Sequence, residues 1–465
     1  MLRRFSPRAL AAVVLVLPAC RAGRAPDLGG IYNRAARSHH ANPVVVIPGI
    51  LGSRLVETRT GQVVWGAFGG GSVDPDDPEG ARLFALPMAE DRELEDLVDG
   101  VRSDGALDRL EVSLLGLPIF LDAYRTILSV LGVGGYRDQA LGELGVVDYG
   151  TDHYTCFQFD YDWRRDLVEN ARRFGEFLEE QRAFVSMQRR ERGVGDPDDV
   201  RFDVVAHSMG GLLLRTWLRY GAGDPLTGEP PTWAGAALVE RAILVGTPNS
   251  GSALALFDLV EGRDFGLFGN TYEAALIGTF PSVYQLLPRR RHEALDDGAD
   301  PLDPRMWEER GWGLADPDQA EPLAWLLPDV ADARERRRIA LAHQRRCLVR
   351  ASALHRALDT PSRPPPGTEL FLVAGDAVDT TDGVSWDPRR RKLRAASSGP
   401  GDGTVLRRSA LGDERLPSSW KPRVRSPIHW SGVLFLFQDH LGLTKDEAFT
   451  DNVLYLLLED PRGAD

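Results

Sequence analysis

Short runs of apolar residues recur along the chain, separated by longer stretches with helical periodicity. Six such runs are evident: Val44–Ile47, Tyr154–Phe159, Phe202–Ala206, Ala242–Val245, Leu370–Ala374 and Val433–Phe437. A run without regular polar alternation suits a strand that is buried on both faces of a sheet. We therefore expect six strands at the centre of the fold.

Between these runs, apolar residues recur at every third or fourth position, which is the spacing of one helix face. Such faces lie within residues 123–131, 174–184, 212–218 and 449–457. Strands that alternate with helices are usually joined in parallel by crossover connections. The pattern predicts an α/β fold with a mostly parallel, doubly wound sheet.

Two segments interrupt the alternation. Residues 60–120 are rich in Gly and Asp and show weak periodicity, whereas residues 253–366 are helical in character and poor in strands. We interpret 253–366 as a helical cap over the carboxyl edge of the sheet, inserted between two parts of the core, 42–252 and 367–465. Some of its large side chains are candidate pocket walls or plain core: Phe257, Phe265, Phe268, Phe280 and Trp325.

Composition narrows the class of protein. The chain has 465 residues, of which 43% are apolar and 26% charged, and its net charge is −13. This balance is that of a globular protein, and the acidity argues against nucleic acid as a partner. Three cysteines are too few for a disulfide framework, and the histidines lack metal-ligand spacing, so we expect no metal site.

The N-terminus resembles an export signal. Residues 1–20 combine a basic start with a short apolar stretch, as in a secretory signal peptide, and end in Leu-Pro-Ala-Cys, which resembles a bacterial lipobox. The resemblance implies cleavage before Cys20 and lipidation of its thiol, with residues 21–41 as a tether to a membrane surface. We therefore expect a lipoprotein exported to the bacterial envelope. An ordinary cleaved signal and an uncleaved short anchor are the alternatives.

Residues 202–211 read as a strand, a sharp turn and the start of a helix, with Ser208 at the turn. Such a turn strains the backbone and presents the serine Oγ above the sheet. The positions two before and two after the serine need small side chains, and Ala206 and Gly210 occupy them, although the usual pattern has glycine at both. We expect Ser208 to be a nucleophile. A buried serine that caps a helix is the alternative.

A nucleophilic serine needs a base, and the base needs an orienting carboxylate. For this type of turn, the order along the chain is serine, acid, histidine. The glycine-flanked loop at 401–405 presents Asp402 after the fifth apolar run, so Asp402 is the preferred acid. Asp376 and Asp379, directly after that run, are its competitors.

Only two histidines follow Asp402. His440 lies between the last apolar run and the last helix, on a loop at the carboxyl edge of the sheet, and is the preferred base. His429 precedes that run and would face the wrong end of the sheet. His207, next to the serine, is interpreted as a packing residue.

A tetrahedral intermediate also needs N–H donors for its oxyanion. The first helical residue after the serine, Met209, supplies one main-chain N–H. The glycine-containing loop at 48–53, after the first strand, supplies the other, and Ile50 is the candidate donor. A plain structural turn is the alternative interpretation of this loop.

Taken together, the motifs resemble the family of lecithin:cholesterol acyltransferase and phospholipid:diacylglycerol acyltransferase, within the α/β-hydrolases. The resemblance implies an α/β-hydrolase fold, with Ser208 as nucleophile, Asp402 as acid and His440 as base, and with Ile50 and Met209 as oxyanion donors. It rests on eight segments in the family's order: 46–55, 64–65, 161–164, 206–211, 246–252, 281–288, 401–405 and 439–443.

The resemblance implies acyl transfer from a phospholipid or acylglycerol through an acyl-serine intermediate, without a cofactor. The acceptor is left open between a sterol, a diacylglycerol and water, because the sequence does not show how well the site excludes water. A lipase or small-ester carboxylesterase is one alternative. A surface-anchored binding protein that has no activity is another.

Overall fold

The computed structural model of the chain describes residues 26–37, 41–66, 73–106, 118–264, 271–292, 294–416 and 421–462. The predicted signal peptide with Cys20, and the pocket-wall candidates Phe265 and Phe268, lie outside the described residues. No helix among the described residues is both long enough and apolar enough to cross a membrane.

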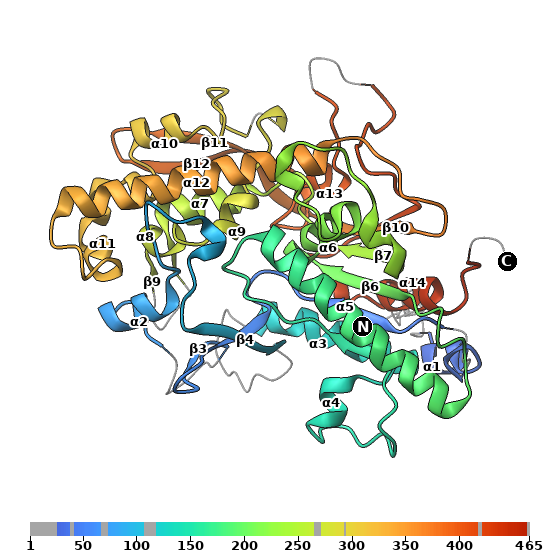
Figure 1. Cartoon of the computed structure of the whole chain (residues 1–465). Helices are drawn as coiled ribbons and strands as arrows, with labels where there is room; N and C mark the ends of the chain where they lie inside the picture. The colour runs from blue at the N-terminus through green and yellow to red at the C-terminus, as the bar shows by residue number, and fades with distance from the viewer. Residues whose placement is uncertain are drawn as a thin grey trace, which may run out of the picture.

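All six apolar runs form strands of one sheet, so the predicted parallel α/β architecture is confirmed (Figure 1). The spatial order is β13-β10-β7-β6-β1-β5, and every pairing is parallel. The strands are β1 (Val44–Ile47), β5 (Cys156–Gln158), β6 (Phe202–His207), β7 (Val239–Val245), β10 (Glu369–Gly375) and β13 (Gly432–Leu436). Their carboxyl ends therefore meet at one edge.

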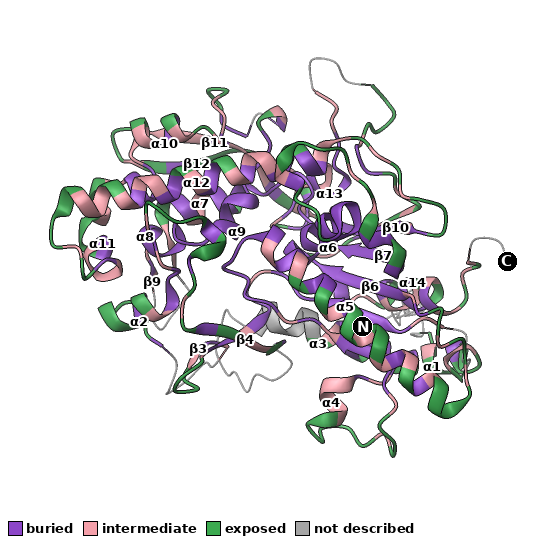
Figure 2. Cartoon of the chain, viewed as in Figure 1, coloured by how far each residue is buried: buried purple, intermediate pink, exposed green. Residues whose placement is uncertain are grey.

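The central strands have no polar alternation because helices cover both faces of the sheet (Figure 2). In β1, Val44 and Val46 pack in one core with residues of α1 (Leu28–Tyr32), α3 (Pro118–Val133) and α14 (Glu447–Leu458). Val45 and Ile47 point the other way, into a larger core with α5 (Leu167–Arg192) and α6 (Met209–Tyr220). The four predicted helix faces all lie on helices of this set.

A second, smaller sheet follows β1 and was not predicted. It is antiparallel, in the order β3-β2-β4, and consists of β2 (Ser53–Glu57), β3 (Val63–Trp65) and β4 (Val101–Ala106). The four inner residues of β4 are partly or fully exposed, which is why no apolar run marks it. The helices α2 (Pro78–Phe84) and α4 (Gln139–Glu143) complete this half of the chain.

The segment between β7 and β10 is mostly helical. Its longest helix is α12 (Ala333–Asp359), and a short hairpin of β8 (Arg263–Asp264) and β9 (Thr271–Tyr272) follows its first helix. The other helices are α7 (Ala253–Glu261), α8 (Ala274–Ile277), α9 (Pro281–Gln285), α10 (Pro304–Arg310) and α11 (Ala320–Leu326).

A long antiparallel hairpin, also absent from the sequence prediction, joins β10 to the acid loop. Its strands are β11 (Val378–Asp387) and β12 (Lys392–Gly401), and α13 (Arg407–Leu411) follows. Trp386 packs against Trp312 of the helical segment with the ring centroids 5.2 Å apart. The hairpin thus links the sheet to the helical segment and ends directly before Asp402.

The structure also describes part of the expected tether and two of the cysteines. Part of the expected tether is packed on the core, because Tyr32 is buried and its hydroxyl donates to the carboxylate of Asp451 at 2.7 Å. Cys156 and Cys347 are both buried free thiols.

Candidate active site

The turn after β6 holds Ser208 in a backbone conformation that non-glycine residues rarely adopt, with φ 53° and ψ −124°. Its N–H donates to the Val245 carbonyl at 2.7 Å, which fixes the turn to the neighbouring strand. The predicted need for a small residue two positions later holds, since a Cβ on Gly210 would lie 2.5 Å from the Pro48 carbonyl oxygen. Strain of this kind persists only where the surroundings impose it, and it is common at reactive side chains.

Asp402 lies just beyond the β11–β12 hairpin and is 2% exposed. One carboxylate oxygen, Oδ1, accepts two main-chain N–H bonds, from Thr404 at 3.0 Å and from Val405 at 2.6 Å. The other oxygen, Oδ2, lies 2.8 Å from Nδ1 of His440. The two carboxylate oxygens therefore have different partners: Oδ1 accepts from main-chain N–H groups of its own loop, and Oδ2 contacts the His440 ring.

His440 lies between Asp402 and Ser208 and is 4% exposed. Its Nε2 is 3.0 Å from Ser208 Oγ, and its main-chain N–H donates to the Asp402 carbonyl at 2.8 Å. An ionised carboxylate can only accept, so Nδ1 carries the proton and Nε2 is free to accept from the serine hydroxyl. The three residues predicted from the sequence are thus brought together in one chain of hydrogen bonds.

The competing residues lie elsewhere. Asp376 forms an ion pair with Arg407 at 3.3 Å, and Asp379 is in β11. His429 borders a separate cavity beside Arg219. None of these three is among the hydrogen-bond partners of Ser208 or His440 in the described part of the chain.

His207, interpreted from the sequence as a packing residue, also contacts His440. Its Nε2 lies 3.3 Å from the His440 carbonyl oxygen, and the two ring centroids are 5.0 Å apart. Burial lowers the pKa of His207 to about 3, so its ring is neutral at ordinary pH and can donate from Nε2 to that carbonyl. His207 therefore helps to hold the backbone of the His440 loop.

The two expected oxyanion donors flank the serine. Met209 is the first residue of α6, and the first N–H groups of a helix have no acceptor within the helix. Gly49 lies so close to the serine that a Cβ there would be 2.9 Å from Ser208 Cβ, and Ile50 follows it. The left-handed backbone of Leu51, with φ 66°, marks the tight turn of this loop.

Two aromatic residues after β5 support that loop. The Tyr161 hydroxyl donates to the Pro48 carbonyl at 2.9 Å, and the Trp163 indole N–H donates to the Ser53 carbonyl at 3.2 Å. Both side chains are 1% exposed. They fix the candidate oxyanion loop relative to the sheet.

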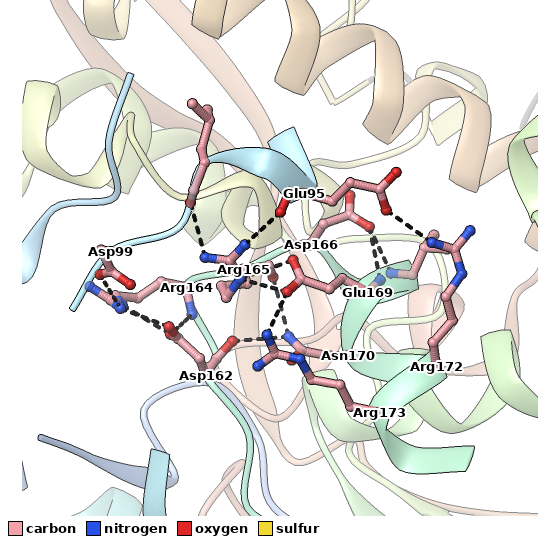
Figure 3. A network of polar contacts seen from close by, with 12 residues as sticks. Glu95, Asp99, Asp162, Arg164, Arg165, Asp166, Glu169, Asn170, Arg172 and Arg173 are labelled. Carbon is pink, nitrogen blue, oxygen red and sulfur yellow. Dashed lines mark hydrogen bonds and ion pairs between the residues drawn. The ribbon is translucent and has the colours of Figure 1, made fainter. Parts of the chain in front are cut away.

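A buried polar network holds the segment that carries these aromatic residues (Figure 3). The Arg164 guanidinium is fully buried and lies 2.7 Å from Asp162 and 2.7 Å from Asp99. It also donates to the Phe84 carbonyl at 2.8 Å. The buried cation is thus paired with two carboxylates and one carbonyl, and these contacts offset the cost of burying its charge.

A small, largely apolar cavity adjoins the candidate oxyanion loop. It is lined by Ile50, Leu51, Phe84, Trp163, Asp258, Arg263, Tyr272, Ile277, Phe280 and Val283. Of the wall candidates taken from the sequence, Phe280 lines it, whereas Phe257 and Trp325 do not. Its volume is about 40 Å³, so it holds at most a small part of an apolar chain.

Sequence reasoning missed the two charged residues in this cavity. Arg263 Nη2 lies 2.8 Å from Asp258 Oδ2, and Arg263 Nε donates to Asp258 Oδ1 at 2.9 Å. Burial raises the pKa of Asp258 to about 6, although the guanidinium opposes this shift. Nothing in the sequence indicates that two opposite charges five residues apart face a cavity.

No group of three or more His, Cys, Asp or Glu side chains in the described residues is arranged to hold a metal ion.

Comparison with known proteins confirms the resemblance seen in the motifs. Residues 139–312 match the model of the lecithin:cholesterol acyltransferase family. The matched region includes Ser208 and the cavity residues Asp258 and Arg263 and ends before Asp402 and His440. No curated protein matches the chain.

One solved structure shares the overall fold, and two others align less closely. The structure of the Tle4–Tli4 complex aligns with a TM-score of 0.52 at 15% identity, over 90% of this chain and 98% of that one. The mature lipase BlEst2 of Bacillus licheniformis aligns at 0.30 and 13%, over 90% and 92%. The phospholipase PlaB of Legionella pneumophila aligns at 0.27 and 15%, over 62% and 42%. The chain has the α/β-hydrolase fold, and the family match supports an enzyme that acts on lipid esters.

Proposed function

We propose that this protein is a serine enzyme that transfers the acyl group of a phospholipid or acylglycerol through an acyl-serine intermediate. Ser208 is the nucleophile, His440 the general base and Asp402 the residue that orients the base. The observation that carries the proposal is the continuous contact from Asp402 Oδ2 through both ring nitrogens of His440 to Ser208 Oγ, at 2.8 and 3.0 Å. A plain helix-capping serine would not need a buried imidazole and carboxylate in line with it.

In the first half of the reaction, Ser208 Oγ attacks the ester carbonyl carbon while His440 Nε2 takes the hydroxyl proton. The carbonyl oxygen becomes an oxyanion, which the N–H groups of Ile50 and Met209 stabilise. The tetrahedral intermediate then collapses, the ester C–O bond breaks, and His440 returns the proton to the leaving alkoxide. The product is a lipid alcohol, such as a lysophospholipid, and an acyl-serine.

In the second half, an acceptor hydroxyl attacks the acyl-serine while His440 again takes the proton. Water gives a free fatty acid, and a sterol or diacylglycerol gives a new ester. The apolar cavity beside Ile50 supports a substrate with an acyl chain, because it adjoins the proposed oxyanion loop.

Covalent labelling tests whether Ser208 is the nucleophile. A fluorophosphonate probe should label the wild-type protein once, on the peptide that contains Ser208, and Ser208→Ala should abolish the label. Ser129→Ala is a matched control, since that serine is exposed on α3 and its hydroxyl only donates to the Arg125 carbonyl. A folded wild-type protein that never reacts would favour a non-catalytic binding role.

Product analysis tests the substrate class. The protein is incubated with mixed phospholipid vesicles that contain a sterol and a diacylglycerol, and the products are identified by mass spectrometry. Fatty acid alone indicates hydrolysis, and a new sterol ester or triacylglycerol indicates transfer. A strong preference for acetyl esters over long-chain esters would refute the lipid assignment in favour of a carboxylesterase.

We also propose that the protein is exported and anchored to the bacterial envelope through a lipid on Cys20. The support is the sequence alone: a basic start, a short apolar stretch and a lipobox-like ending. In a bacterial host, the wild-type chain should incorporate labelled fatty acid and fractionate with membranes, and Cys20→Ser should do neither. A Cys20→Ser chain that remains membrane-bound and is not cleaved would indicate an uncleaved anchor.

A further inference from the structure

A pocket of about 240 Å³ lies at the amino edge of the sheet, opposite to the candidate active site. Pro43 and Thr155, which directly precede β1 and β5, form part of its wall, whereas Ser208 follows the carboxyl end of β6. Since strands rise about 3.3 Å per residue, the four residues of β1 alone separate the two edges by roughly 13 Å. The pocket is therefore a site distinct from Ser208.

Four arginines line this pocket, and none of its lining residues is acidic. They are Arg37, Arg137, Arg189 and Arg192. They come from the N-terminal segment, from the loop after α3 and from the C-terminal end of α5. In a chain of net charge −13, four cations around one pocket make the electrostatic potential there locally positive, which favours an anionic ligand.

Among the described residues, none of the four arginines forms an ion pair within 4 Å. Arg137 donates to the carbonyl oxygens of Tyr149 and Thr151, at 2.8 and 2.7 Å. These contacts orient the guanidinium without neutralising it.

Arg189 is held in the same way, by the carbonyl oxygens of Asp196 and Asp199, both at 2.7 Å. Their carboxylates favour its charge, but burial outweighs them and lowers the pKa of Arg189. A bound anion would relieve this cost of burial. Arg37 and Arg192 are exposed at the entrance.

We infer that this pocket binds the phosphate group of a small phosphate ester, with the guanidinium groups on the phosphate. Four guanidiniums that form no ion pair within the described part of the chain suit a phosphate oxyanion, because arginine matches its geometry with two parallel N–H bonds. The volume exceeds that of a single water site and leaves room for a short polar body. The ester is either the headgroup of an anionic phospholipid or a soluble phosphate ester.

Calorimetric titration with glycerol 3-phosphate tests the soluble source, and flotation with phosphatidic acid vesicles tests the lipid source. Both are carried out in a Ser208→Ala background so that no substrate is turned over. Saturable binding in either arm, weakened by added salt, supports the site. Vesicle binding alone assigns the lipid headgroup. Absence of saturable binding in both arms would overturn the inference.

Two substitutions assign the binding to the pocket. Arg37→Ala and Arg192→Ala each remove an exposed side chain without an ion pair among the described residues, so neither should destabilise the free protein. Each should weaken binding about tenfold, the usual effect of losing a hydrogen bond to a charged group. The control Arg182→Ala removes a cation of the same helix that is paired with Glu179 outside the pocket, and it should bind normally. Equal affinity in all three variants would refute this location.

Discussion

Replacing Asp402 by Asn tests how the acid loop controls the base. The two carboxylate oxygens of Asp402 are not equivalent, because Oδ1 accepts from the N–H groups of Thr404 and Val405 while Oδ2 faces His440. An asparagine must keep its only oxygen at the Oδ1 position, since an NH₂ group there would oppose two N–H donors. Its NH₂ group then faces His440 Nδ1.

The expected consequence is the wrong tautomer of the imidazole. An NH₂ donor beside Nδ1 stabilises the tautomer in which Nδ1 accepts and Nε2 carries the proton. That Nε2 cannot accept from Ser208 Oγ, which lies 3.0 Å away. A carboxylate-to-amide change in a serine–histidine–aspartate site lowers kcat by about 10⁴-fold through this effect, which corresponds to roughly 5.4 kcal/mol in the barrier.

The assay is kcat and KM for a long-chain ester, with near-ultraviolet circular dichroism to confirm folding. We expect kcat of Asp402→Asn to fall by about 10⁴-fold with little change in KM. Asp376→Asn is the matched control, because Asp376 also follows β10 but pairs with Arg407, and it should retain nearly full activity. The reasoning is refuted if folded Asp402→Asn keeps more than about a tenth of wild-type kcat.

Three further changes test the surroundings. Gly49→Ala places a Cβ 2.9 Å from Ser208 Cβ, so we expect the rate of fluorophosphonate labelling to fall by about 10²-fold, and an unchanged rate would contradict the close approach. Arg164→Met leaves the buried carboxylate of Asp162 without its cation and should lower the free energy of unfolding in urea by roughly 3–5 kcal/mol; a loss below about 1 kcal/mol would show that the network contributes little. Burial lowers the pKa of His343 to about 4, so unfolding takes up a proton between that value and about 6.5, and stability is lost as the pH falls through this window. His343→Gln should remove about 1.4 kcal/mol per pH unit from that slope, and an unchanged slope would count against a neutral buried imidazole.

The main sheet and the three proposed catalytic residues could be predicted because one feature of the sequence encodes both. Ser208 and His440 come shortly after apolar runs, and Asp402 follows one by way of the β11–β12 hairpin; parallel strands bring the ends of such runs to one edge. The meeting of these ends does not depend on how many residues connect one strand to the next. Thus 232 residues separate Ser208 from His440 in the chain, yet their side chains lie 3.0 Å apart.

The second sheet and the β11–β12 hairpin could not be predicted in the same way. In β12, most residues between Leu393 and Gly401 are exposed, so neither an apolar run nor a clean alternation marks the strand. Its stability comes from pairing with β11 and from contacts such as Trp386 with Trp312. These contacts depend on the helical segment, which lies elsewhere in the sequence.

The two cavities show why chemistry is harder to predict than topology. Asp258 lies in α7 and Arg263 begins β8, and only tertiary packing brings them beside Ile50. Likewise, Arg37 and Arg192 belong to segments about 150 residues apart that meet at the amino edge.

A sequence motif can identify a catalytic residue, but the hydrogen bonds around that residue decide which of its atoms can take part in the reaction. For Asp402 the sequence indicates the acid, whereas only the two N–H bonds to Oδ1 show which oxygen faces the histidine, and the asparagine experiment depends on that assignment.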